Sequence, residues 1–306
     1  MKEESIIKEL TLQCRNAPLQ NGIGDDCALI ADQQVVSTDT MVEGVHFDDR
    51  LSPEDVGWKL VAVNASDIAS MGRAPNWATL NLSIPESIKS DWVVSFARGM
   101  RMALSTWSIA LVGGDVVRTS GPIVVSMTMG GIGRTKPIWR SGAKIGNAIF
   151  VTGNLGEAAA GFFEKNNEEG LRWLRRPRPP IEVAVNLGSI GIPTAMMDIS
   201  DGLHKDLLRL CEASDVGAYI DAELIHKGPA LAHIQDPLAY QTSFGDDYEF
   251  LFTANPDMEK LIRQVARRYR VRITQIGRII STPEEGPRAY IRGKDWPKPL
   301  FQHFST

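Results

Sequence analysis

Aspartates recur at the ends of apolar segments along this chain of 306 residues, and they limit how it can fold. Residues 35–40 run from two valines into Ser-Thr-Asp-Thr, so a buried strand would end in a row of oxygen-bearing side chains. Residues 196–201 do the same, and Asp198 and Ser200 share one face of an extended segment because side chains alternate there. The positions of this kind are Asp25, Asp26, Asp39, Asp67, Asp115, Asp198, Asp201, Asp246 and Asp247. The fold must therefore place many carboxylates at the edge of its core.

These carboxylates predict a site for a divalent cation. Burying several carboxylates together is unfavourable unless cations neutralise them. Hard oxygen ligands suit Mg²⁺ or Ca²⁺, and Mg²⁺ is usually held by a few carboxylates together with substrate phosphates. A single aspartate in a loop is most often a turn former or a helix N-cap, and we expect that plainer role for Asp25, Asp32, Asp55 and Asp247. The residues by themselves predict a metal site that handles phosphate.

Strands and helices alternate in two consecutive halves of the chain. In the first half, the pattern predicts helices over residues 5–12, 52–70 and 89–107, and strands over residues 27–30, 35–38, 77–84, 109–112 and 123–132. In the second half, it predicts strands over residues 148–151 and 248–252, and helices ending at Phe162 and over residues 202–214 and 256–268. The first long helix should begin at Ser52, because serine is a good N-cap and Pro53 fits the first helical position. This mixture predicts an α+β fold.

A turn-rich stretch over residues 133–146 separates the two halves. It predicts a boundary between an N-terminal domain over residues 1–137 and a C-terminal domain over residues 138–306. The second half also carries a group of basic residues before two prolines, which we interpret as a solvated loop. These residues are Arg172, Arg175, Arg176 and Arg178.

Composition and charge bear on partners and compartment. The hydrophobic fraction is 43% and the charged fraction 23%, both near the average of soluble globular proteins. The formal net charge is −4, which gives no electrostatic reason to expect nucleic acid or an anionic membrane as a partner. No apolar run approaches the ~20 residues of a membrane span. The odd number of cysteines (Cys14, Cys27 and Cys211) predicts free thiols in a reducing compartment, and we expect a cytoplasmic protein.

Several common nucleotide and metal motifs are absent from the sequence. It contains no G-x-x-x-x-G-K-[ST] motif, which excludes a P-loop, and it lacks the protein-kinase signature set. Gly131 and Gly133 follow an expected strand, but Lys136 stands where the dinucleotide fingerprint needs a small residue. The five histidines form no H-E-x-x-H motif, which disfavours zinc. A polyphosphate would therefore have to bind through bridging cations.

A series of motifs resembles the thiamine-monophosphate kinase family, in that family's order and over nearly the whole chain. In the first half they are Gly-Ile-Gly-Asp-Asp-Cys-Ala (22–28), Ser-Thr-Asp-Thr (37–40), Gly-Val-His-Phe (44–47), Val-Asn-Ala-Ser-Asp-Ile-Ala-Ser-Met-Gly (63–72) and Val-Gly-Gly-Asp (112–115). In the second half they are Arg-Ser-Gly-Ala-Lys (140–144), Val-Thr-Gly-Asn-Leu-Gly (151–156), Asp-Ile-Ser-Asp-Gly-Leu (198–203) and Gly-Asp-Asp-Tyr-Glu (245–249). Each motif is a modest signal, and the series is specific.

The resemblance implies the two-domain fold of aminoimidazole-ribonucleotide synthetase, which selenophosphate synthetase and the hydrogenase-maturation dehydratase share. The N-terminal α/β domain would bind ATP and Mg²⁺ and pack with a second copy into a dimer barrel. The C-terminal α/β sandwich would complete the active site. The reaction implied is direct, in-line transfer of a phosphoryl group from ATP to thiamine monophosphate, which gives thiamine diphosphate. It needs Mg²⁺ but no covalent catalyst among the side chains.

The resemblance also implies roles for individual residues. Several Mg²⁺ ions would be held by Asp26, Ser37, Thr38, Asp39, Asp67, Asp115, Asp198 and Asp201. The nucleotide would contact Gly114, Arg140 and Ser200. Thiamine monophosphate would contact His46, Asp246 and Phe301. These roles suit phosphoryl transfer, which depends on positioning and charge neutralisation.

Plainer roles remain open for two of these residues, and two others depart from the family pattern. His46 could instead be a packing residue between Val45 and Phe47, and Arg140 could be a surface cation. Asp246 stands where the family usually has glutamate, so it keeps the charge and loses one methylene of reach. Phe301 replaces a tyrosine, which keeps the stacking surface and removes a hydroxyl.

The sequence disfavours two other classes of function, namely another ATP-dependent enzyme of this fold and a non-catalytic nucleotide-binding sensor. Selenophosphate synthetase would need a reactive cysteine in a glycine-rich segment with lysine, and Cys14 lacks that setting. The hydrogenase-maturation protein would need a terminal cysteine, whereas the sequence closes on Thr306. A nucleotide or metabolite sensor on the same fold would be expected to lose some of the aspartates, which are intact here.

Overall fold

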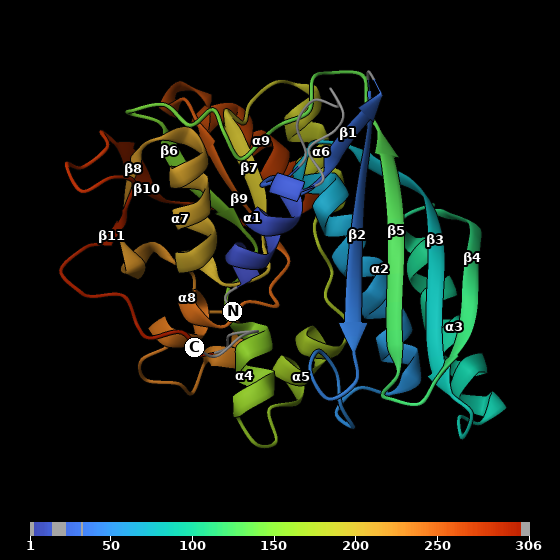
Figure 1. The fold of residues 1–306 in the computed structure, drawn as a ribbon. Helices are drawn as coiled ribbons and strands as arrows, with labels where there is room; N and C mark the ends of the chain where they lie inside the picture. Colours follow the sequence, from blue (N-terminus) through green and yellow to red (C-terminus); the bar gives the residue numbers. More distant parts are fainter. Residues whose placement is uncertain (1–2, 14–22, 32, 301–306) are drawn as a thin grey trace.

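The computed structural model describes residues 3–13, 23–31 and 33–300, and Figure 1 shows them as two sheets with helix α2 between them. The sheet of the first half has the order β1 (Ala28–Ala31), β2 (Gln34–Val42), β5 (Val124–Ile132), β3 (Ala74–Pro85) and β4 (Ala110–Thr119). All neighbouring strands in it are antiparallel except β3 and β4, which are parallel. The strand β4 is last in this order and forms one edge of the sheet. Because β3 and β4 are parallel, the chain must cross over between them, and helix α3 (Ser90–Thr106) makes this connection.

Two helices, α2 (Pro53–Ser70) and α3 (Ser90–Thr106), cover one face of this sheet. Alternation along β5 sends Val125, Met127 and Met129 into the core beneath them. The opposite face carries hydroxyl side chains, and Thr40 donates a hydrogen bond to Ser126 across it (2.8 Å). A short helix, α1 (Glu3–Gln13), precedes the sheet.

Helix α2 begins as the sequence predicts. Ser52 is the N-cap, and its hydroxyl accepts a hydrogen bond from the Asp55 backbone N–H while the Asp55 carboxylate accepts one from the Ser52 N–H. Pro53 occupies the first helical position. Almost every residue of α2 is buried, because the helix also packs on α6 and β7 of the second half. A locally encoded helix thus becomes the element that both halves share.

The second half contains a six-stranded sheet. Its order is β11 (Ala289–Ile291), β8 (Gly217–Ile220), β10 (Ile273–Ile280), β6 (Ala148–Thr152), β9 (Glu249–Ala254) and β7 (Ala195–Ile199). Helix α7 (Leu203–Ser214) covers one face, and α6 (Ile181–Ser189) and α9 (Glu259–Tyr269) cover the other. The remaining helices are α4 (Glu157–Phe163), α5 (Glu168–Arg175), α8 (Leu238–Ser243), η1 (Ala222–Leu224), η2 (Pro229–Leu231) and η3 (Pro256–Met258). The expected α+β class with mixed sheets in both halves is confirmed.

The strand β7 is buried on both faces, and its two-residue period decides where Asp198 points. Met197 and Ile199 pack toward α7, whereas Met196 packs in the core that contains α2. Asp198 shares the face of Met196 and therefore meets α2, where Ser66 bonds to it. The alternation predicted for residues 196–201 thus delivers a carboxylate between the halves.

Three expectations about local structure are wrong. The strand expected over residues 35–38 continues as β2 to Val42, because it pairs with β5 along its whole length. The strand expected over residues 109–112 continues as β4 to Thr119, because it pairs in parallel with β3 through the glycines. A Cβ on Gly114 would lie 2.1 Å from the Leu80 carbonyl oxygen, so only glycine permits this approach. Part of the arginine group, interpreted as a loop, forms α5, since Leu174 is buried on one face and the Asn167 side chain caps the helix start.

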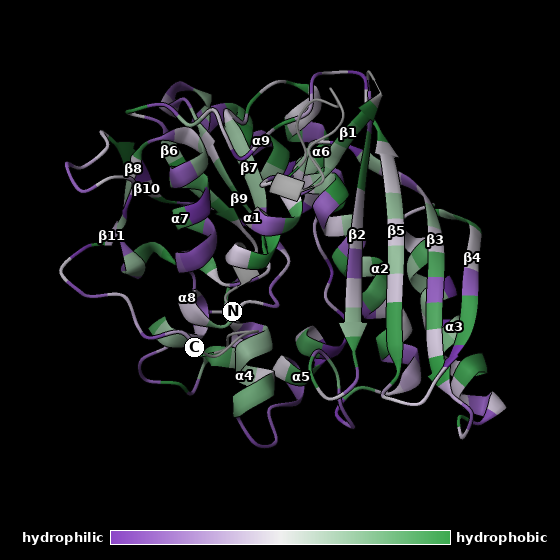
Figure 2. Cartoon of the chain, in the orientation of Figure 1, coloured by the Kyte–Doolittle hydropathy of each residue, from purple (hydrophilic) through white to green (hydrophobic). Residues whose placement is uncertain are grey.

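Exposed hydrophobic side chains mark the edge strand β4. Leu111, Val112, Val116 and Val117 are all exposed there, and Figure 2 shows hydrophobic colouring along part of this strand. Among the described residues, every helix is too short or too polar to cross a membrane. The cysteines Cys27 and Cys211 are buried free thiols, and Cys14 lies outside the described residues.

Candidate active site

Three aspartates from distant parts of the chain meet between the two halves. Asp26 comes from the loop before β1, Asp67 from α2 and Asp198 from β7, and one carboxylate oxygen of each lies within 4.8 Å of the others. Asp26 and Asp198 are buried. The three residues are called the carboxylate cluster below.

Each carboxylate of the cluster accepts a hydrogen bond from a serine hydroxyl. The pairs are Ser70 with Asp26 (2.5 Å), Ser37 with Asp67 (2.6 Å) and Ser66 with Asp198 (2.7 Å). Ser66, Asp67 and Ser70 lie on one helix, so a single element positions all three acids. The Asn64 side chain also accepts a hydrogen bond from the Asp39 N–H (3.1 Å), which ties β2 to the same helix.

The cluster is electrostatically strained in the absence of a cation. Burial raises the pKa of Asp67 well above its ordinary value, and repulsion from Asp39 and Asp198 raises it further. Burial, followed by repulsion from Asp26, raises the pKa of Asp198 in the same way. For Asp39, burial and the charge of Asp26 raise the pKa to about 6. A doubly charged cation bound among these carboxylates would offset their mutual repulsion and favour their ionised forms.

Arg140 supplies positive charge on one side of the cluster. Its Nη2 lies 2.5 Å and its Nε 2.9 Å from the Asp26 Oδ1, and its backbone N–H donates to Asp25 (2.9 Å). The Arg140 side chain is only 17% exposed, so the plainer expectation of a surface cation is wrong. For Asp25, burial raises the pKa to about 6 although it accepts this bond.

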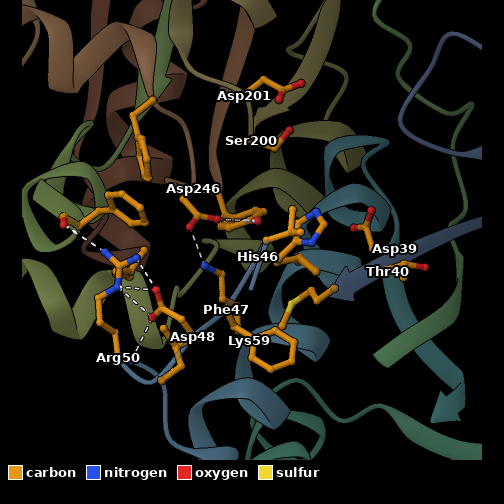
Figure 3. Close-up of a pocket in the computed structure, with 18 of the residues that line it drawn as sticks. Asp39, Thr40, His46, Phe47, Asp48, Arg50, Lys59, Ser200, Asp201 and Asp246 are labelled. Atoms are coloured by element: carbon orange, nitrogen blue, oxygen red, sulfur yellow. Dashed lines mark hydrogen bonds and ion pairs between the residues drawn. The ribbon is translucent and has the colours of Figure 1, made fainter. Parts of the chain in front are cut away.

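A cavity of about 450 Å³ extends from the cluster toward helices α4 and α5. Asp39, Asp67, Asp198, Ser200 and Asp201 line one end of it. The other end is lined by His46, Phe47, Asp48, Arg50, Leu51, Lys59, Phe162, Leu174, Phe244, Asp246 and Tyr248. Figure 3 shows Asp201 and Ser200 well separated from Asp48 and Arg50, with Asp246 and Lys59 between them. We call the two parts the metal end and the acceptor end.

Two ion pairs occupy the acceptor end. The Lys59 Nζ lies 2.6 Å from the Asp246 Oδ2, and the Tyr248 hydroxyl donates to the Asp246 Oδ1 (3.0 Å). Arg50 holds Asp48 through its Nε and Nη2 atoms, and its guanidinium lies 3.8 Å from the centre of the Phe162 ring. Aromatic rings and internally balanced charge therefore characterise this end of the cavity.

His46 lines the cavity and does more than pack between its neighbours. Its Nδ1 accepts a hydrogen bond from the Val42 backbone N–H (3.0 Å), so in the neutral ring the proton is on Nε2. The ring orientation is therefore fixed by the strand that carries Asp39.

Asp201 differs from the cluster, because it already has cationic partners. Its Oδ2 lies 2.5 Å from the Arg209 Nη1 and 3.1 Å from the Lys205 Nζ. Burial works against its ionisation, but the two cations outweigh burial and hold the pKa of Asp201 below its ordinary value. Asp206, which is fully buried, bonds to the Asp201 N–H and to the same arginine.

Three other residues with expected roles lie outside the cluster. Asp115 pairs with Asn81 on β3, which places it on the outer face of the sheet, and the strands β5 and β3 separate it from Asp39 on β2. Gly114 precedes it on the same exposed edge strand. The Thr38 hydroxyl bonds to Thr128 on the outer face (2.9 Å), so only the backbone oxygen of Thr38 remains for a metal on the inner side.

Phe301 lies outside the described residues, and its expected contact with the acceptor stays a prediction. The plainer role expected for Asp55 is confirmed, since its carboxylate accepts a hydrogen bond from the Ser52 N–H at the start of α2. The same expectation is wrong for Asp247, because its carboxylate is buried, which raises its pKa, and accepts a hydrogen bond from the Gly156 N–H, 91 residues away (2.9 Å). Asp32 lies outside the described residues as well.

The sequence reasoning missed Lys59, although a signal for it was present. Lys59, Val63 and Asp67 follow one another at intervals of four residues on α2, and all three line the cavity. The rings at the acceptor end had no local signal, because Phe162 and Phe244 belong to α4 and to the loop before β9.

The fold and the site define a member of the AIR synthase-related proteins. The model of the AIR synthase related protein N-terminal domain matches residues 24–133, and that of the C-terminal domain matches residues 144–289. The first sheet, strands β6 to β10 of the second and the loop that carries Asp26 fall within these matches.

Within that class, the chain belongs to the thiamine-monophosphate kinase family. It is 36% identical over 301 residues to the thiamine-monophosphate kinase of Buchnera aphidicola subsp. Acyrthosiphon pisum, with 92% of each chain covered. The crystal structure of thiamine-monophosphate kinase from Stenotrophomonas maltophilia K279a matches with a TM-score of 0.78 at 34% identity, over 95% of each chain. AaThiL complexed with AMPPCP and TMP matches with a TM-score of 0.86 at 28% identity, over 99% of this chain and 97% of that one.

Proposed function

We propose that this chain transfers the γ-phosphoryl group of ATP to thiamine monophosphate, which yields ADP and thiamine diphosphate. One observation carries the proposal: a single cavity joins the carboxylate cluster to the aromatic and ion-paired acceptor end, in a chain that matches kinases of this name over nearly its full length. The relative AaThiL, which binds AMPPCP and TMP, has the same fold. Donor and acceptor phosphates would meet inside this cavity, so direct in-line transfer needs no phosphorylated side chain.

Mg²⁺ fits the donor set at the metal end. Asp26, Asp67 and Asp198 offer hard oxygen ligands within reach of one ion. The raised pKa values of Asp67 and Asp198 show that their negative charges are poorly compensated by the chain, which a bound cation would correct. Asp39, the Ser37 hydroxyl and the Thr38 backbone oxygen would complete the binding of one or more ions. Bound there, Mg²⁺ would neutralise the phosphates of the nucleotide.

The chain's own residues would bind and orient both substrates. Arg140, on the far side of Asp26, and Ser200, at the end of β7, would contact the nucleotide. Asp201 would take an additional ion, with Arg209 as its fixed partner. At the acceptor end, His46 and Asp246 would contact thiamine monophosphate, with Phe301 as a further aromatic wall.

Asp115 and Gly114 support the proposal of a homodimer. Asp115 faces outward on β4, and three strand spacings of roughly 4.8 Å separate it from β2, so it cannot join Asp39 in its own chain. A second copy of the chain would therefore have to supply Asp115 to the metal end from its own β4. The exposed hydrophobic residues of β4 fit such a contact.

The dimer can be tested by mixing two inactive variants. Asp39→Asn and Asp115→Asn, denatured and refolded together, should regain about a quarter of the wild-type activity, because half of the sites in mixed dimers are intact. A mixture as inactive as its components would reject the contribution of Asp115 from a second copy.

We extend the proposal to domains and location. Residues 1–137 would bind ATP and metal and form the dimer, and residues 138–306 would complete the site; the separate sheets support this division. The free thiols of Cys27 and Cys211 fit a cytoplasmic location.

The function is tested by a direct assay. The purified chain with ATP and Mg²⁺ should convert thiamine monophosphate to thiamine diphosphate and should leave free thiamine unphosphorylated. Chromatography separates thiamine, thiamine monophosphate and thiamine diphosphate, so it measures phosphorylation of either acceptor. ATP consumption without thiamine diphosphate would reject the acceptor.

A further inference from the structure

Lys59 is a buried cation next to the proposed acceptor. It lies on α2 with a relative exposure of 2%, in the row with Val63 and Asp67 that lines the cavity. An ammonium group removed from water is unfavourable unless a carboxylate pairs with it. A lysine at this position therefore needs a fixed partner, and its partner is part of the site.

Asp246 is that partner, and it is held from several directions. Lys59 bonds to one carboxylate oxygen and Tyr248 to the other. The backbone N–H groups of Asp246 and Tyr248 donate to the carbonyls of Ser200 (3.0 Å) and Ile199 (2.9 Å), at the end of the strand that carries the metal end. Asp246 and Tyr248 both have positive φ, at 62° and 51°, a backbone conformation that side-chain-bearing residues rarely adopt. Such a conformation persists only where the surrounding contacts fix it.

The two charged side chains of this pair differ in their exposure. The side chain of Lys59 is 3% exposed, whereas that of Asp246 is 23% exposed. Both residues line the cavity, and the carboxylate is the more exposed of the two charges. Arg50, the other Lys or Arg that lines the described cavity, is already held by Asp48 and by the Phe162 carbonyl.

We propose that Lys59 is a positioning residue for acceptor recognition, which holds the Asp246 carboxylate at the cavity wall so that this carboxylate meets thiamine monophosphate. The inference rests on the proposed function and adds a residue to it. Lys59 acts on the acceptor only through Asp246, and the nucleotide, bound at the metal end, is not affected. Neutral variants of Lys59 and Asp246 must therefore be non-additive toward the acceptor.

The test is a double-mutant cycle with Lys59→Met, Asp246→Asn and the double variant, measured as KM and kcat for each substrate. Lys59→Met should raise the KM for thiamine monophosphate about tenfold or more, with the KM for ATP within about twofold of wild type. Lys59→Arg should restore most of the loss. In the double variant, removal of the lysine should cost little beyond Asp246→Asn. Lys89→Met, at an exposed lysine before α3, is the matched control.

The outcomes separate the inference from the proposed function. A wild-type chain that makes no thiamine diphosphate overturns both. An active wild type whose Lys59→Met variant keeps the acceptor KM, or loses ATP affinity equally, overturns the inference alone. Additive increases in the acceptor KM across the cycle would also overturn the inference, because a lysine with a purely structural role would act independently of Asp246. If Lys59→Met fails to fold, the double variant is compared with Asp246→Asn. Both lack the carboxylate through which Lys59 is proposed to act, so the lysine should make little difference between them, and unequal acceptor KM values would contradict the proposal.

Discussion

The two ends of the cavity solve the problem of buried charge in opposite ways. At the acceptor end, Asp246 and Asp48 each have a cation from the chain, Lys59 and Arg50. At the metal end, Asp67 and Asp198 accept hydrogen bonds from the hydroxyls of Ser37 and Ser66, and their pKa values are raised. The chain thus balances charge where a small organic molecule would bind and leaves an excess of negative charge where ions and phosphates would meet.

Removal of one carboxylate from the metal end should have the largest effect. Asp198→Asn keeps the hydrogen bond from Ser66 possible but removes a proposed metal ligand, so kcat should fall roughly 10³-fold. Without Mg²⁺ the same variant should melt higher than wild type, because repulsion within the cluster is relieved. Steady-state kinetics and thermal melts in EDTA measure both, with Asp257→Asn, at an exposed site, as the control. If Asp198→Asn had an activity near that of wild type, the metal end would not differ from the acceptor end in needing its carboxylates for catalysis.

The metal end should also make stability depend on pH and Mg²⁺ together. The folded-state pKa of Asp39, about 6, exceeds its ordinary value of 3.8, and the pKa values of Asp67 and Asp198 are raised as well. The folded chain therefore binds more protons than the unfolded chain, so this contribution to stability is present below about pH 4 and is lost as pH rises through about 6. Mg²⁺ should raise the Tm by roughly 4 °C at pH 8 and by much less at pH 5, where protons already neutralise the acids. Equal shifts at both pH values would contradict this account.

Asp201 offers a sharper comparison within the metal end. Because Arg209 and Lys205 already balance its charge, Asp201→Asn should reduce kcat/KM only about tenfold, mainly through the KM for ATP. Comparison with Asp198→Asn in one assay tests the point. Losses of the same size would show that the existing ion pairs do not distinguish Asp201 from the cluster.

The smallest effect is expected from a ring at the acceptor end. Phe162→Ala removes the ring beside Arg50 and should raise the KM for thiamine monophosphate about fivefold, without changing the KM for ATP. The neighbouring Phe163 does not line the described cavity, so Phe163→Ala is the control. A higher KM for ATP in Phe162→Ala would mean that the two ends do not act separately.

Local sequence signals predicted helices and individual strands better than the site. Ser52, Pro53 and Asp55 define the start of α2 within four residues, so this helix could be predicted from its own sequence. The Ser66–Asp198 bond joins residues 132 apart, and the Lys59–Asp246 bond joins residues 187 apart. No local pattern encodes such distances. The family resemblance brought Asp26, Asp67 and Asp198 into one hypothesis. The spacing of Lys59 from Asp67 placed the lysine on the same face of α2, but its pairing with Asp246 required the two halves to be packed together.

The outward position of Asp115 is a second feature that local sequence signals did not predict. Its motif, Val-Gly-Gly-Asp, suggested the end of a strand, but β4 continues past it because the glycines allow close pairing with β3. A residue's role at a site can depend on a second copy of the chain, and one chain's sequence does not state the arrangement of two.

The central claim is that Asp26, Asp67 and Asp198 form a metal site. Mn²⁺ can replace Mg²⁺ in such sites and is visible by anomalous X-ray scattering. A crystal of the chain with Mn²⁺ and a non-hydrolysable ATP analogue should show an anomalous peak about 2.2 Å from carboxylate oxygens of Asp67 and Asp198. An ordered nucleotide with no Mn²⁺ at these carboxylates would contradict the account.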